Sequence, residues 1–200
     1  MRSYSLWILL LCVGLLCIGH GLHGTLIAVK ANEANFRSDT TGLVMSGYSA
    51  GVLFSALLVP RLVGKVGLVR AFAGLASVVS TVVLLVPLWV NPAFWFFMRF
   101  IAGLCTSGLY IVCESWLNSL SDNKTRGRML SVYMMVVYGS VGAGQLLLNV
   151  QDDSGFARFI LVSALLSLSL VPLILLPTEA PDVAGAKPVE LSLIWRASPL

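Results

Sequence analysis

Six long apolar stretches, separated by short polar breaks, dominate the sequence. A helix needs about 20 apolar residues to cross the hydrocarbon core of a bilayer, and each stretch is about that long. Because lipid offers the backbone no hydrogen-bond partners, stretches of this length cross it only as helices. We therefore predict an all-α, polytopic membrane protein with spans at about 6–29, 42–62, 71–90, 94–117, 129–150 and 156–176.

The composition agrees with a membrane protein. Only 11% of the residues are charged and 58% are hydrophobic, whereas about 25% of a soluble globular chain is charged. The lipid bilayer is therefore an expected partner. The net charge of +4 could suggest nucleic acid, but no cluster of aromatic and basic residues accompanies it. Basic residues near helix ends explain the charge better, and we expect no nucleic-acid partner.

The distribution of Lys and Arg predicts the orientation. With six spans, nine basic residues fall on one side and three on the other, and the heavier side is cytoplasmic by the positive-inside rule. Both termini are then cytoplasmic. The heavier side holds Arg2, Arg61, Lys65, Arg70, Lys124, Arg126, Arg128, Lys187 and Arg196, and the lighter side holds Lys30, Arg37 and Arg158.

The two ends of the chain have different characters. The first apolar run could be a secretion signal, but it exceeds signal-peptide length and no small-x-small cleavage site follows it. We therefore count it as a helix and predict one bundle over residues 1–177. Residues 178–200 are richer in proline and charge, which is typical of a cytoplasmic linker. They turn apolar again at Leu191–Trp195, so we expect the linker to lead toward a missing second half.

Polar residues are unevenly spread over the spans. The third contains no charged residue and the sixth only Arg158 at its start. Their hydroxyls can bond to carbonyls of their own helix, so these helices can face lipid. The second carries Gly47, Gly51 and Ser55 at steps of four, a spacing that favours close helix packing.

The first, fourth and fifth spans carry polar stripes. On the fourth, five residues fall within about 80° of one another around the helix. The fifth repeats this pattern, and the first places two histidines beside Gly24. Polar stripes on membrane helices usually face a protein interior or a water-filled cavity. The stripes contain His20 and His23; Arg99, Gly103, Ser107, Tyr110 and Glu114; and Ser131, Tyr138, Gly142, Gln145 and Asn149.

Metal, disulfide and catalytic sites are not expected. The four cysteines lie in apolar runs without a Cys-x-x-Cys pair, so they should be buried thiols. Cys17, His20 and His23 follow at steps of three, but three ligands from one helix seldom complete a soft-metal site. No nucleophile–base set, carboxylate pair or phosphate loop is present. We therefore expect no cofactor, no metal and no enzyme activity.

Loop motifs suggest a family. The segment 60–70 resembles the major facilitator loop signature, with Lys65 at the first Arg position and Gly67 at the inner Gly. It departs where Pro60 replaces a Gly and Gly64 replaces the Asp. On the fourth span, Arg99-x-x-x-Gly103 is similar to another superfamily signature, and Glu114 precedes Arg126-Gly127-Arg128 as in members of the family.

The resemblance implies a fold and a function. The chain would be one six-helix half of a twelve-helix major facilitator fold in a bacterial inner membrane. Such a protein is a secondary transporter that works by alternating access, here for a small organic solute or drug-like molecule. Protons are a candidate coupling ion, because His20, His23 and Glu114 can titrate. The fifth span lacks the proline of the antiporter pattern, which disfavours that class.

We keep two alternatives, a membrane-embedded enzyme and a six-helix channel or scaffold. The substrate or ion pathway would use His20, His23, Arg99, Tyr110, Glu114, Tyr138, Gln145 and Asn149.

Overall fold

The computed structural model describes residues 2–122, 124–152 and 155–175, and every regular element within them is a helix. Six helices are long and apolar enough to cross a membrane, as the sequence predicted. Short 3-10 turns extend the third and fifth, and a short helix follows the sixth. The elements are α1 Arg2–Glu33, α2 Ser38–Val66, α3 Leu68–Leu85, η1 Val86–Leu88, α4 Pro92–Leu120, α5 Arg126–Leu146, η2 Leu147–Asn149, α6 Ala157–Leu168 and α7 Val171–Leu175.

The helices extend past the apolar stretches that predicted them. The polar break expected over 61–70 is almost entirely helical, because α2 ends at Val66 and α3 begins at Leu68. Lys and Arg are good helix formers, so the basic residues continue the helices instead of ending them. The turn needs only Gly67, whose φ of 81° costs glycine little. The proposed linker, 178–200, lies outside the described residues.

Local chemistry fixes other helix ends. Asn91 caps α4, where its side-chain oxygen accepts a hydrogen bond of 3.1 Å from the Phe94 amide, and Pro92 occupies the first turn, which tolerates proline. The carboxylate of Asp152 accepts hydrogen bonds from the amides of Ala157 and Arg158 at the start of α6. The last span breaks between α6 and α7 just before Pro172, which cannot donate a backbone hydrogen bond.

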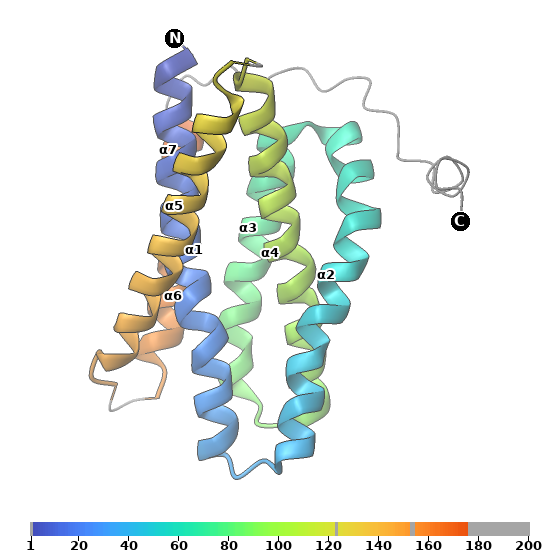
Figure 1. Cartoon of the computed structure of the whole chain (residues 1–200). Helices are drawn as coiled ribbons and strands as arrows, with labels where there is room; N and C mark the ends of the chain where they lie inside the picture. Colours follow the sequence, from blue (N-terminus) through green and yellow to red (C-terminus); the bar gives the residue numbers. More distant parts are fainter. Residues whose placement is uncertain (1, 123, 153–154, 176–200) are drawn as a thin grey trace, which may run out of the picture.

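The helices run up and down through the bundle (Figure 1). The N-terminal end of α1 and the α2–α3 and α4–α5 connections lie at one end, and the α1–α2 connection lies at the other. The main contacts pair α2 with α4 and α1 with α5, while α3 contacts α4 and α6. Helices α2 and α5 contribute the smallest buried shares of the six spans. They therefore carry most of the uncovered helix surface.

The α2–α4 contact is very close. A Cβ added at Gly47 or Gly51 would overlap the backbone of Phe96 or Phe100 on α4, and one at Gly103 would overlap Tyr48. Small residues let helix backbones approach to this distance. A second close contact joins α1 and α5, where Gly21 faces Val141 and Gly144 faces Ile18. The bundle therefore contains two tightly packed helix pairs.

Helices α3 and α6 are joined by hydroxyls, which the sequence did not predict. The Ser80 hydroxyl lies 2.7 Å from that of Ser163 and 3.0 Å from that of Ser167. Thr81 and Ser169 bond within their own spans as expected, through the carbonyls of Ser77 and Leu166. Backbone carbonyls are available to any helical serine, but a partner on another helix depends on packing, which composition does not give.

Candidate functional site

A buried cation on α4 is the centre of the candidate site. Arg99 lies seven residues after Pro92, about 10 Å along the helix, yet its side chain turns inward and is only 5% exposed. It therefore does not extend toward the membrane surface. Its Nε and Nη1 atoms have no hydrogen-bond partner among the described residues. A charge at this depth costs about 2.5–3.5 kcal/mol on insertion scales, so the guanidinium needs an interaction that offsets this cost.

Tyr48 on α2 supplies part of that interaction. The Arg99 Cζ atom lies 4.8 Å from the centroid of the Tyr48 ring, in the geometry of a cation–π contact. Such contacts contribute about 0.5–2 kcal/mol, which does not fully offset the insertion cost. Tyr48 is not among the residues predicted from the sequence, because the small residues of the second span indicated helix packing alone. A polar aromatic residue beside Gly47, mid-span, was the available signal.

Two histidines of α1 lie close to these residues. The His20 ring lies 5.8 Å from the Tyr48 ring at an interplanar angle of 26°, and 6.0 Å from the Tyr110 ring, nearly edge-on. His23 is 2% exposed. His20 Nδ1 and His23 Nε2 also have no described hydrogen-bond partner. We call Cys17, His20, His23, Tyr48, Arg99 and Tyr110 the polar cluster.

The polar cluster offers hydrogen-bond donors to a ligand. A guanidinium can only donate, so the two unpaired nitrogens of Arg99 need acceptors. The Cys17 thiol contacts a tyrosine, because its Sγ lies 3.4 Å from the Tyr110 hydroxyl. The described residues contain no group of three or more His, Cys, Asp or Glu side chains that could hold a metal ion. Water or an acceptor-bearing solute fits this chemistry.

The predicted stripe on α4 does not act as one surface. Arg99 and Tyr110 belong to the polar cluster, but Gly103 packs against the Tyr48 backbone. Ser107 receives a hydrogen bond of 2.8 Å from the Ser55 hydroxyl of α2. Thus part of the stripe serves helix packing. The stripe was expected to face a protein interior or a water-filled cavity, and Gly103 and Ser107 face the interior against α2.

Glu114 lies apart from the polar cluster. It is 15 residues beyond Arg99, about 22 Å along α4, and it is exposed on the surface of the bundle. Within the described residues it forms no ion pair with Arg126 or Arg128. Helix α4 therefore has one buried charge near one end and one exposed charge near the other.

The polar residues of α5 lie on its uncovered face. Tyr138 is 73% exposed, and Gln145 and Asn149 are exposed as well. The side chain that α5 buries is instead Tyr133, whose hydroxyl has no described partner. The stripe thus faces away from the bundle formed by the described residues.

The residues of the two loop motifs, in the α2–α3 and α4–α5 connections, lie at the end of the bundle where α1 begins. Lys65 lies in the last turn of α2 beside the Gly67 turn, and Arg126 begins α5. Arg126, Gly127 and Arg128 are exposed. Both motifs lie at the same end of the bundle (Figure 1).

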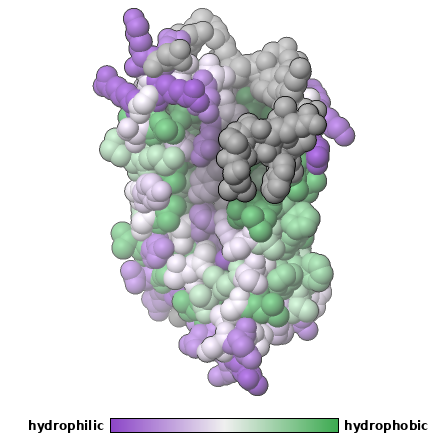
Figure 2. Space-filling view, turned by 45° about the vertical axis from the view of Figure 1, so that its right-hand side comes forward, coloured by the Kyte–Doolittle hydropathy of each residue, from purple (hydrophilic) through white to green (hydrophobic). Residues whose placement is uncertain are grey.

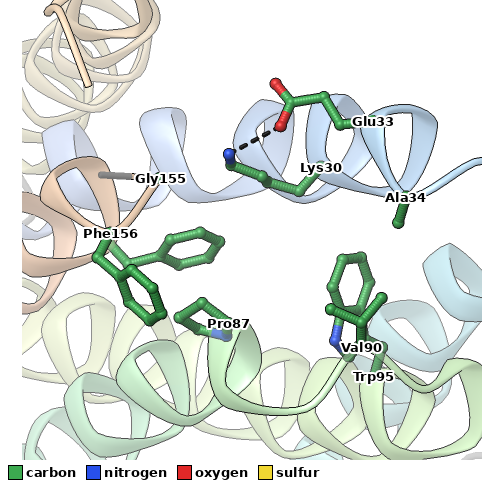
Figure 3. Close-up of a pocket in the computed structure, with 9 residues that line it drawn as sticks. Lys30, Glu33, Ala34, Pro87, Val90, Trp95, Gly155 and Phe156 are labelled. Carbon is green, nitrogen blue, oxygen red and sulfur yellow. Dashed lines mark hydrogen bonds and ion pairs between the residues drawn. The ribbon is translucent and has the colours of Figure 1, made fainter. Parts of the chain in front are cut away.

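A small pocket lies at the opposite end (Figure 3). It encloses about 280 Å³ and is lined mainly by apolar residues, including Trp95 and Phe156. The Lys30 ammonium is paired with Glu33 at 2.7 Å, and the Trp95 indole nitrogen donates to the carbonyls of Val86 and Trp89. These polar groups are already satisfied, so the pocket is a weaker candidate than the polar cluster.

Figure 2 shows the face reached by turning the bundle 45°. A recessed band of hydrophilic and weakly hydrophobic residues runs down the middle of this face, with hydrophobic patches on both sides. The hydrophobic patches suit lipid, and the band suits water or a polar partner.

Comparison with known proteins assigns the sequence to a family. The sequence matches the Major Facilitator Superfamily over residues 9–199. An uncharacterized MFS-type transporter from Enterobacter sp. (strain 638) is 34% identical over 153 residues, which are 74% of this chain and 40% of that protein. The transporter YcaD of Salmonella newport (strain SL254) gives the same identity and coverage.

A further relative covers more of the chain. An uncharacterized MFS-type transporter from Yersinia enterocolitica is 30% identical over 176 residues, 87% of this chain and 46% of that protein. The chain thus spans less than half the length of these relatives. With six membrane-spanning helices in the order of one superfamily half, the chain belongs to the major facilitator superfamily.

Proposed function

We propose that this chain forms the six-helix half of a secondary transporter that moves a small organic solute by alternating access. The polar cluster is the observation that carries the proposal. A buried Arg99 with two unpaired nitrogens is a costly feature for a purely structural bundle. Secondary transporters bind their cargo near the bilayer midplane between two repeats, and a cargo acceptor group would complete the cluster.

The pathway would follow the predicted site residues. His20, His23, Arg99 and Tyr110 would form the cargo end, while Tyr138, Gln145 and Asn149 of α5 would face a second half across the pathway. Their exposure supports this role, since a polar face on a membrane helix is best covered by protein or water.

Proton coupling is the second part of the proposal. Glu114 would carry a proton or serve a gate, and the cluster histidines are further titratable groups. Glu114 lies far from Arg99 and forms no described ion pair with the basic motif, so it is available for such a role. The motif residues Lys65, Gly67, Arg126, Gly127 and Arg128 would hold the end of the bundle at which they gather.

The proposed location is a bacterial inner membrane with both termini cytoplasmic. The end with the α2–α3 and α4–α5 connections carries Arg61, Lys65, Arg70 and the Arg126–Arg128 motif. At the other end Lys30 pairs with Glu33, and Arg37 lies 3.2 Å from Asp39. This asymmetry supports the orientation by the positive-inside rule. The relatives reported above come from bacteria.

Transport by the full-length protein tests the proposal. Solutes should be identified first, by comparing metabolite pools of cells and medium with and without the overexpressed protein. Saturable uptake into proteoliposomes should then be lost in Arg99→Ala and in Glu114→Gln while both variants accumulate normally. Arg37→Ala, an exposed arginine outside the proposed pathway, is the control and should transport normally. Normal uptake by both site variants, or no solute that depends on the protein, would contradict the assignment.

A further inference from the structure

A crevice on the uncovered side of α2 lies outside the polar cluster. It encloses about 370 Å³ between α2, α3 and α4 near the end of α2 that leads into α3. Its floor is buried, since Val59 is 1% and Leu75 is 6% exposed. Its rim is open, since Leu58 is 47% and Leu62 is 37% exposed. The lining consists of Leu58, Val59, Arg61, Leu62, Lys65, Leu75 and Leu104.

Packing at one glycine shapes the floor of the crevice. A Cβ at Gly108 of α4 would lie 2.8 Å from a Val59 methyl carbon and 2.9 Å from a Leu75 methyl carbon. At this glycine, α2 and α3 therefore both converge on α4. Toward the membrane surface the two helices leave the crevice between them. The crevice is thus part of the packed fold.

The polar lining of the crevice is entirely cationic. Arg61 and Lys65 are four residues apart, so they share one face of α2, and both are exposed. Neither forms an ion pair with any described residue. Like charges at this spacing repel each other on a helix, and an anion between them would replace that repulsion with two charge-assisted hydrogen bonds. Position 64 of α2, between these two residues, is a glycine, so it supplies no carboxylate beside them.

We propose that this crevice binds one anionic phospholipid, with the phosphate between Arg61 and Lys65 and an acyl chain along the leucines. The dimensions suit this occupant, because Leu58 lies about 10 Å deeper along α2 than Lys65. The charged end is therefore at the headgroup level and the apolar end is in the hydrocarbon. Basic pockets between membrane helices bind anionic headgroups in this way. The inference rests on the membrane-spanning fold and is independent of transport.

Native mass spectrometry of the delipidated full-length protein tests the inference. Phosphatidylglycerol and phosphatidylethanolamine with identical acyl chains are the probes. We expect phosphatidylglycerol to bind more tightly. The double variant Arg61→Gln/Lys65→Gln should weaken that binding about thirtyfold, from about 1 kcal/mol for each basic residue. Lys124→Gln/Arg128→Gln removes the same charge at the same end of the bundle but outside the crevice, and it should bind normally.

Further experiments distinguish binding of the lipid from binding of a free anion, and a loss of binding from a loss of folding. Leu62→Trp fills the crevice without changing charge and should weaken binding, whereas the charge-conserving pair Arg61→Lys/Lys65→Arg should retain it. Glycerol phosphate, which lacks acyl chains, should not displace the lipid at equal concentration. Equal binding of the two lipids, equal losses in the two charge-removing doubles, unchanged binding in Leu62→Trp, or displacement by glycerol phosphate would each overturn the proposal.

Discussion

The close contact between α2 and α4 predicts a large cost for one methyl group. A Cβ added at Gly51 would overlap the Phe100 carbonyl oxygen and lie 2.7 Å from the Leu104 amide nitrogen, so α2 must move away by about 1 Å. A gap of that size forfeits about a quarter to a half of each packing contact. Overpacking typically costs about 1–3 kcal/mol. The 2.8 Å bond between Ser55 and Ser107, one turn away, adds about 0.6 kcal/mol.

The gain of about 0.5–1 kcal/mol that a helical glycine-to-alanine change brings offsets part of this cost. Gly51→Ala should therefore destabilise the bundle by about 1–3 kcal/mol. The measurement is the SDS mole fraction at which the protein unfolds in mixed micelles, followed by circular dichroism. Gly74→Ala is the matched control. A Cβ at Gly74 meets nothing within 4 Å, and replacing a helical glycine by alanine stabilises by about 0.5–1 kcal/mol. Ser107→Ala should also cost less in the Gly51→Ala background than alone, because separation has already broken its bond. Equal unfolding midpoints for the two alanine variants would refute the close-packing argument.

Two other predictions concern topology and the α3–α6 contact. A cysteine at Asn35 should react with an impermeant maleimide added to intact cells, and one at Gly64 should not; labelling of Gly64→Cys from outside would reverse the proposed orientation. Ser80→Ala should lower the unfolding midpoint by the equivalent of about 1 kcal/mol, since it removes hydrogen bonds to α6. Thr81→Ala loses a hydrogen bond only within α3 and should cost less. Equal losses in the two variants would argue against the inter-helix hydroxyl contact.

The fold was predictable because the bilayer restricts a chain to few solutions. Apolar length alone identified the six spans, since runs of about 20 apolar residues suit helices, whereas the strands of a closed barrel need only about 9–11 residues. Helix ends were less predictable, because Arg61 and Lys65 favour helix even where they leave the hydrocarbon. The break before Pro172 follows from proline chemistry, although no break was predicted there.

The candidate site was predictable only in part. Charge in an apolar helix identified Arg99, and polar residues on α1 identified His20 and His23, because such residues are costly in lipid wherever they point. Tyr48 was missed because its role depends on which helix α2 contacts, and a single sequence does not state this. The contact of Ser107 with Ser55 of α2 was not predicted for the same reason. Periodicity predicts which residues share one face of a helix, but it does not predict which helix packs against that face.

The α3–α4 hairpin has a consequence for how this protein enters a membrane. Helix α4 carries the buried Arg99, whereas α3 contains no charged residue after Arg70 and is the more apolar of the two. The chain between them is tied by the Trp95 indole, which donates to Val86 at 3.0 Å and to Trp89 at 2.8 Å. During synthesis α3 leaves the ribosome first and is already beside the translocon when α4 arrives. The two helices can then partition into lipid together. The favourable insertion free energy of α3 would offset the cost of inserting Arg99 with α4.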